Sequence, residues 1–103
     1  MIMQELLLKQ EVFGLVETGA KHSTSRKGKR DIKCGPLLFK MTEDESRQVT
    51  VNVTGIRYIP YGELTDEEAK AEGYEHISEL RDILTRIYGE IKSDEPFTFI
   101  EFD

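Results

Sequence analysis

Three hydroxyl side chains stand in a row in this sequence, between two cationic side chains. Ser23, Thr24 and Ser25 follow Lys21 and precede Arg26. A hydroxyl becomes a nucleophile when a base removes its proton, and a lysine serves as that base once burial or a neighbouring positive charge makes it neutral. An arginine can hold a carbonyl or phosphate oxygen. The stretch therefore has the residue types for acyl transfer or for phosphate binding.

Residues 19–33, which surround these hydroxyls, concentrate the positive charge of the chain. They hold six of the 14 Lys and Arg residues and one acid, Asp31, although the whole chain has a net charge of −6. A basic segment on an acidic chain indicates a local face for anions. The overall negative charge argues against duplex DNA as a partner, because affinity for a polyanion grows with the number of phosphates neutralised.

The spacing Gly19-x-Lys21-x-x-Thr24-x-Arg26 resembles the signature of the ASCH domain, a small β-barrel related to the PUA group of RNA-associated modules. By length and layout the chain is similar to the small bacterial N4-acetylcytidine amidohydrolases, which are single ASCH domains. The resemblance covers nearly all of the sequence. It implies an α+β fold, with a small PUA-like β-barrel and flanking helices, and one ASCH domain over residues 1–103.

The same resemblance implies a reaction: removal of the acetyl group from N4-acetylcytidine or a related modified nucleoside. Lys21, Thr24 and Glu72 fall on the catalytic positions. Lys21 is then the base, Thr24 the nucleophile that becomes acylated, and Glu72 the acid that protonates the leaving amine. Water completes the cycle by hydrolysing the acyl-threonine. Ser23 and Ser25 are the nucleophiles to test if Thr24 is not required.

Two alignments lead to the position of the acid. Aligned forward from Thr65, Glu72 matches the catalytic position. Aligned backward from the pair Glu79-Leu80, Gly73 takes that place and one residue is inserted. The alternative interpretation of Glu72 is a solvated carboxylate at the end of an acidic helix.

RNA binding without turnover is the competing interpretation of the same cleft. The side chains that would contact phosphates or bases are Arg26, Lys27, Lys29, Arg30 and Tyr74. The basic loop, which is an addition to the amidohydrolase pattern, favours RNA binding, whereas the compact length and the intact Lys-x-x-Thr spacing favour the enzyme. A single-strand ribonuclease would use the ribose 2′-hydroxyl as nucleophile in this cleft. The alternative without a function is that the basic loop after Arg26 is simply a solvated tip.

Composition narrows the remaining possibilities. With 38% hydrophobic and 33% charged residues and no apolar run near twenty, the chain of 103 residues reads as a soluble globular domain away from the membrane. The first eight residues do not resemble a signal peptide, which predicts a cytoplasmic protein. One cysteine, Cys34, and two histidines provide neither a disulfide nor a metal cluster, so we expect no metal and no cofactor.

Hydrophobic periodicity indicates the elements that must position these residues. Helices are expected at 9–18, after the capping-box residues 65–68, and from about residue 78 to Gly89, and strands at 22–26, 37–39, 49–59 and 97–102. The polar strand 22–26 is expected to be exposed, and 97–102, apolar on both faces, to be buried. Lys21 and Thr24 point to opposite faces of a regular strand, so they meet only across a bulge or turn. We expect residues 19–26 to line a cleft.

Overall fold

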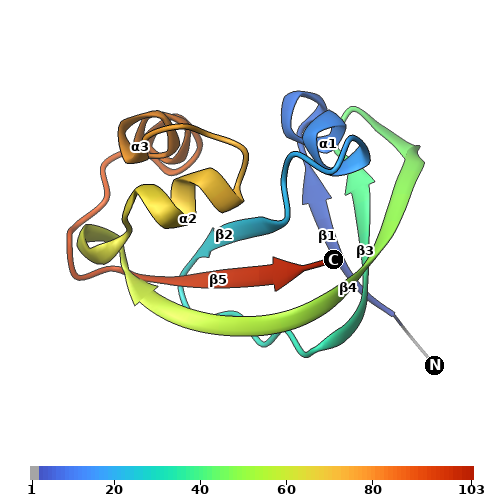
Figure 1. Cartoon of the computed structure of the whole chain (residues 1–103), viewed down its shortest axis with the longest axis horizontal. Coiled ribbons are helices and arrows are strands. Elements are labelled where there is room, and N and C mark those ends of the chain that lie inside the picture. Colours follow the sequence, from blue (N-terminus) through green and yellow to red (C-terminus); the bar gives the residue numbers. More distant parts are fainter. Residues whose placement is uncertain (1–2) are drawn as a thin grey trace.

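The computed structural model describes residues 3–103, which form five strands, three α-helices and one short 3-10 helix (Figure 1). In chain order these are β1 Gln4–Leu8, α1 Gln10–Glu17, β2 Ser23–Lys27, β3 Gly35–Met41, β4 Asp44–Pro60, η1 Tyr61–Glu63, α2 Asp66–Ala71, α3 Ile77–Tyr88 and β5 Pro96–Phe102. The helices and strands expected from periodicity are all present.

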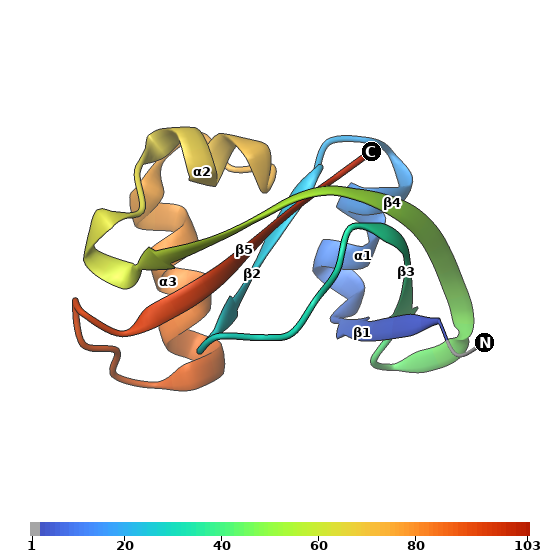
Figure 2. The same ribbon diagram turned by 90° about the horizontal axis from the view of Figure 1, so that it is seen from below.

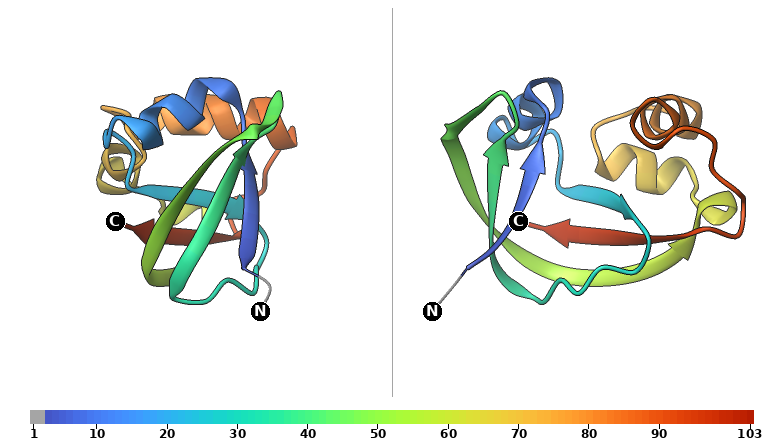
Figure 3. Two further views of the ribbon diagram at one scale, coloured as in Figure 1. Left: turned by 90° about the vertical axis from the view of Figure 1, so that its right-hand side faces the viewer. Right: turned by 180° about the vertical axis from the view of Figure 1, so that it is seen from behind.

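The strands form one mixed sheet in the order β1-β3-β4-β5-β2. β1 runs parallel to β3, and every other pair is antiparallel. The sheet curls into a half-barrel, with α1 over one part and α2 and α3 over another (Figures 1 and 3). This confirms the predicted α+β class and the small barrel, whose two edge strands are β1 and β2.

Strand β4 makes the curl possible because its two halves pair with different partners. Val49 lies opposite Phe39 of β3, whereas Tyr58 lies opposite Thr98 of β5. The pairing with β5 is irregular between Val53 and Gly55, where a bulge bends the strand. Figure 2 shows the resulting long, curved path of β4.

Two hydrophobic clusters enclose β5 between them. Ile100 belongs to the cluster under α1, which also contains Phe13 and Phe39. Phe97, on the opposite face of β5, belongs to the cluster under α2 and α3, together with Leu84. Alternate side chains of a strand point to opposite faces, so both faces of β5 are buried, as the aromatic sequence predicted.

Two helix ends bring the site residues together. α1 ends before Gly19, whose φ of 82° is the left-handed conformation expected after a helix. α2 begins with the predicted capping box of Thr65 and Glu68 and ends before Gly73, whose φ is 99°. The amide of His22 donates to the carbonyl of Ala71 at 2.9 Å, so the turn after α1 lies against the end of α2.

Within residues 3–103, no helix has the length and apolar character that crossing a membrane requires.

Gly73 is therefore expected to tolerate substitution poorly. A Cβ at Gly73 would lie 3.3 Å from Leu15 Cδ1, and the positive φ is unfavourable for any other residue by about 1–2 kcal/mol. Gly73→Ala should lower the free energy of unfolding by at least this amount in a urea titration. Gly14→Ala is the matched control: its Cβ meets nothing within 4 Å inside α1, so it should raise stability by about 0.5–1 kcal/mol. Changes of the same sign in both variants would contradict this account.

Candidate functional site

An ion pair between Lys21 and Glu72 lies at the centre of the site. Lys21 Nζ is 3.0 Å from Glu72 Oε1, and each residue is only 3% exposed. Lys21 comes from the turn after α1 and Glu72 from the end of α2, so two helix ends that are 51 residues apart in sequence supply the pair. The alternative in which Glu72 is a solvated carboxylate is wrong.

Ser25 shares the carboxylate of Glu72 with Lys21. Its Oγ donates to Oε2 at 2.5 Å, so the two oxygens of Glu72 have different donors. Ser25 therefore joins Lys21 and Glu72 in a buried polar cluster, a position that resemblance alone did not assign to it.

The expectation that β2 is exposed is wrong. Ser23, Thr24 and Ser25 are all buried, because α2 covers one face of the strand and the half-barrel covers the other. Hydroxyl side chains usually indicate an exposed strand. Here the strand is buried instead, because elements distant in sequence pack against it. Ser23 Oγ has no hydrogen-bond partner in the described part of the chain.

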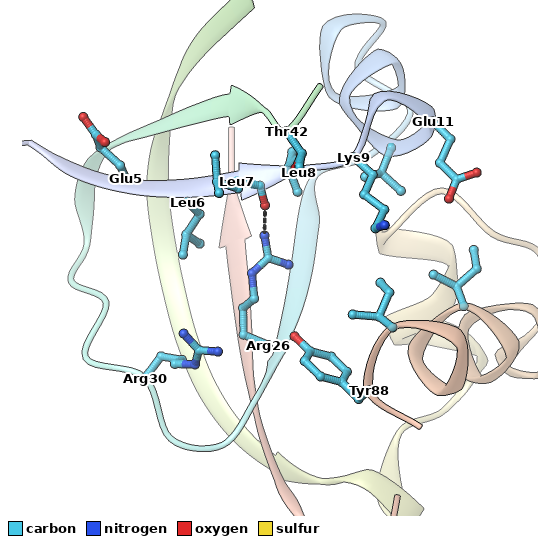
Figure 4. Close-up of a pocket in the computed structure, with 13 residues that line it drawn as sticks. Glu5, Leu6, Leu7, Leu8, Lys9, Glu11, Arg26, Arg30, Thr42 and Tyr88 are labelled. Carbon is cyan, nitrogen blue, oxygen red and sulfur yellow. Dashed lines mark hydrogen bonds between the residues drawn. The ribbon is translucent and has the colours of Figure 1, made fainter. Parts of the chain in front are cut away.

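Thr24 and Arg26 point to the face of β2 opposite to that of Ser23 and Ser25. Arg26 Nη1 donates to Thr24 Oγ1 and to the carbonyl of Ser25, each at 3.3 Å, and Nη2 donates to the carbonyl of Leu7 at 2.7 Å (Figure 4). The guanidinium thereby bridges the two edge strands. In residues 3–103 no hydrogen bond joins Lys21 Nζ to Thr24 Oγ1.

Burial dominates the electrostatics of both cations. Desolvation lowers the pKa of Lys21, Glu72 opposes this through its charge and hydrogen bond, and Arg26 adds to the lowering. Burial also lowers the pKa of Arg26, against the opposing effects of Tyr88 and Glu72. The site therefore favours a neutral Lys21 more than water does, which is the condition for a lysine to act as a base.

A cavity of about 440 Å³ opens between β1, Arg26 and α3 (Figure 4). Of residues 19–26, which we expected to line a cleft, only Arg26 lines this cavity, while Lys21 and Thr24 are buried and do not line it. The guanidinium of Arg26 is thus the link between the cavity and the hydroxyl of Thr24.

The loop after β2 is held against β5. The hydroxyl of Thr98 donates to the carbonyl of Gly28 and accepts from the amide of Arg30, both at 2.7 Å. Gly28 also donates from its amide to the carbonyl of Pro96. Hydrogen bonds to Thr98 and Pro96 therefore fix the backbone of the loop, while the side chains of Lys29 and Arg30 are exposed to solvent, as the alternative of a solvated basic tip expects.

The three cations of this loop have different surroundings. Lys27 Nζ is 3.8 Å from Glu95, and Lys29 Nζ lies 5.8 Å from the centre of the Tyr58 ring. Arg30 lines the cavity. Arg30 thus lines the same cavity as Arg26, whereas Lys27 and Lys29 do not.

Tyr74 lies apart from the cavity. It packs against the cluster under α2 and α3, and burial raises the pKa of its hydroxyl to about 12. Tyr88, which sequence reasoning missed, lines the cavity instead. Its position at the end of α3 has no local sequence signal, since the cavity arises from contacts between distant elements.

Among residues 3–103, no group of three or more His, Cys, Asp or Glu side chains is arranged to hold a metal ion.

Three solved structures share this fold. The ASCH domain from Lactobacillus crispatus JV V101 superposes with a TM-score of 0.71 at 16% identity, over 90% of this chain and 69% of that one. Protein EF3133 from Enterococcus faecalis V583 gives 0.72 at 16% identity, over 100% and 80% of the two chains. The hypothetical protein PH0355 gives 0.74 at 22% identity, over 99% and 98%.

Two sequence comparisons complete this result. A search of curated proteins finds no significant match to the chain. The family model described as the ASCH domain matches residues 2–103, in agreement with the fold. Because this match spans nearly the whole sequence, the protein belongs to the ASCH domain family.

Proposed function

We propose that the protein is an amidohydrolase that removes the acetyl group from N4-acetylcytidine or a related acylated nucleoside, with Thr24 as the nucleophile. The observation that carries this proposal is a buried lysine, Lys21, whose pKa is lowered by desolvation and which is paired with Glu72. Membership of the ASCH family is consistent with such a hydrolase. Thr24 follows Lys21 by three residues in the sequence and is hydrogen-bonded to Arg26, which reaches the cavity.

In the first step the neutral Lys21 takes the proton of Thr24 Oγ1, and Oγ1 attacks the acyl carbonyl. Arg26 holds the oxygen that becomes negatively charged. Lys21 then turns back to Glu72, its partner at 3.0 Å in the free protein, and passes the proton to it. Glu72 gives this proton to the departing amine as the C–N bond breaks. Thr24 is then acylated. In the second step Lys21 takes a proton from water as the water oxygen attacks the ester carbonyl. Lys21 then gives this proton to Thr24 Oγ1 as the ester C–O bond breaks and acetate leaves, which restores neutral Lys21 and the free hydroxyl.

One movement is required before the first step. Lys21 Nζ is bonded to Glu72 in the free protein, so it must turn toward Thr24 when substrate binds. Its side chain has four rotatable bonds, and catalytic hydrogen bonds commonly form only in the substrate complex. Lys21 Nζ shares the Glu72 carboxylate with Ser25, and Thr24 points to the opposite face of β2 from Ser25, so Lys21 has to move to the Thr24 side of the strand.

Substitutions at the two hydroxyls test the nucleophile. Thr24→Val keeps the shape of the side chain without the hydroxyl and should lower acetate release from N4-acetylcytidine by at least about a hundredfold. Thr24→Ser, the matched control, keeps a hydroxyl and should retain measurable turnover. Ser25→Ala should have a smaller effect than Thr24→Val, because Ser25 only donates to Glu72. An inactive Ser25→Ala beside an active Thr24→Val would show that Ser25 is the nucleophile and reject our assignment.

The pH dependence tests the base. Lys21 must be neutral, so kcat/KM should rise with pH through its pKa, which burial places below the ordinary 10.5. Glu72→Gln removes the carboxylate that raises this pKa, so the midpoint of the rise should move to lower pH while the maximal rate falls. Rates measured across the pH range for both proteins provide the check. A midpoint that moves to higher pH, or stays in place, would contradict the role of Lys21.

Single-strand RNA binding without turnover is the second candidate, favoured by one surface feature. Tyr58 is half exposed, Lys29 lies over its ring, and its hydroxyl donates to the carbonyl of Arg30 at 3.1 Å. An exposed tyrosine beside cations is a stacking platform for bases. Under this proposal Tyr58→Ala and Lys29→Ala each weaken the binding of a short RNA in a titration. Equal affinity of both variants and the unmodified protein would count against it.

A further inference from the structure

Two guanidinium groups give one corner of the cavity a positive charge and form no ion pair with a carboxylate of residues 3–103. Arg26 extends toward the carbonyl of Leu7, and Arg30 comes from the loop after β2 (Figure 4). Arg26 donates only to oxygens of Thr24, Ser25 and Leu7, and Arg30 Nε donates to the carbonyl of Lys27 at 3.2 Å. Within residues 3–103 neither guanidinium forms an ion pair with an acidic side chain.

The acids at the rim do not neutralise this corner. Glu5 is paired with Lys40 at 3.2 Å, and Glu11 lies with Lys9 at the far end of the cavity (Figure 4). Arg30 is close enough to Arg26 to lower its pKa further, in addition to the effect of burial. The side chain of Arg30 is exposed, so an anion can reach it from solvent, and a guanidinium group suits the oxygens of a phosphate.

Arg30 is held in place before any ligand binds. Its amide donates to the hydroxyl of Thr98 at 2.7 Å, and its carbonyl accepts from the hydroxyl of Tyr58 at 3.1 Å. The backbone of Arg30 is therefore fixed on both sides, which reduces the entropy lost when its side chain binds an anion.

The remainder of the cavity suits a ring. Its walls include the aromatic ring of Tyr88 beside Arg26 and the apolar side chains of Leu6, Leu7 and Ile87. The volume of about 440 Å³ is within the range of small-molecule sites. The cavity thus combines an apolar and aromatic wall with a cationic corner, which matches a base joined to a phosphate.

We propose that the substrate is a nucleotide rather than an uncharged nucleoside, and that Arg30 binds its phosphate while Arg26 holds the acyl oxygen beside Thr24. The inference rests on the proposed hydrolase function and makes Arg30 the residue that determines specificity. A free mononucleotide and a nucleotide within an RNA strand both carry this phosphate.

The test compares kcat/KM for N4-acetylcytidine with that for its 5′- and 3′-monophosphates. The unmodified protein should prefer one of the monophosphates by at least about tenfold, the effect of one charge-assisted hydrogen bond. Arg30→Ala should bring this ratio close to one, and Arg30→Lys should give an intermediate ratio because it keeps the charge but loses the planar fork. Unfolding curves confirm that the variants are folded.

Lys33→Ala is the matched control. It removes the same charge from the same loop, but the Lys33 side chain is 79% exposed and does not line the cavity. It should preserve the preference for the monophosphate. Equal kcat/KM for the nucleoside and both monophosphates would overturn the proposal, and so would an equal loss of preference in Lys33→Ala and Arg30→Ala.

A binding measurement separates this inference from the hydrolase proposal. Calorimetric titration with cytidine and its monophosphates needs no turnover. Tighter binding of a monophosphate that is lost in Arg30→Ala supports the phosphate site even if no acetate is ever released, an outcome that would reject only the hydrolase. Equal binding of cytidine and both monophosphates overturns the phosphate site. The source of the phosphate follows from comparing an acetylated trinucleotide with the preferred acetylcytidine monophosphate. Faster turnover of the trinucleotide assigns the phosphate to an RNA strand, and slower turnover assigns it to a free nucleotide.

Discussion

The contact on which the site depends is the buried pair of Lys21 and Glu72. Two charges removed from water are stable only with close geometry and further hydrogen bonds, which Ser25 supplies to the second oxygen of Glu72. The pair forms only if the turn after α1 reaches the end of α2, so it couples the placement of those two helices to the sheet. A buried ion pair contributes little net stability, and we therefore read its presence as a sign of function.

Local chemistry explains why much of the fold was predictable from sequence. The capping box at Thr65 and the glycines after α1 and α2 act within a few residues. Alternation of apolar residues predicted the strand near Val51, and apolar residues on both faces predicted the buried strand near Phe99. These signals do not depend on the rest of the chain. The resemblance to the amidohydrolases assigned Lys21 and, by one of two alignments, Glu72 to the same site, and in the structure their side chains are in contact although they are distant in sequence.

What the sequence could not reveal depends on contacts between distant elements. Ser23 and Ser25 are polar, yet β2 is covered on both faces, because α2 and the half-barrel pack on opposite sides of it. Tyr88 lines a cavity that exists only because α3 and β1 approach one another. Tyr74 looked equally suitable for a ligand and instead packs beside the helices. Hydrophobic periodicity shows which face of a helix or strand is buried, but it does not show which other element packs against that face.

The bridge from Arg26 to Leu7 also bears on how the sheet avoids self-association. Edge strands expose unpaired backbone groups that can pair with another chain. Here the two edges of the half-barrel, β1 and β2, are linked across the cavity by a side chain, and a charged group occupies the position where a further strand would bind. The half-barrel thus keeps an opening of ligand size between its edge strands β1 and β2. The charge of Arg26 at this opening disfavours the pairing of another chain with either edge.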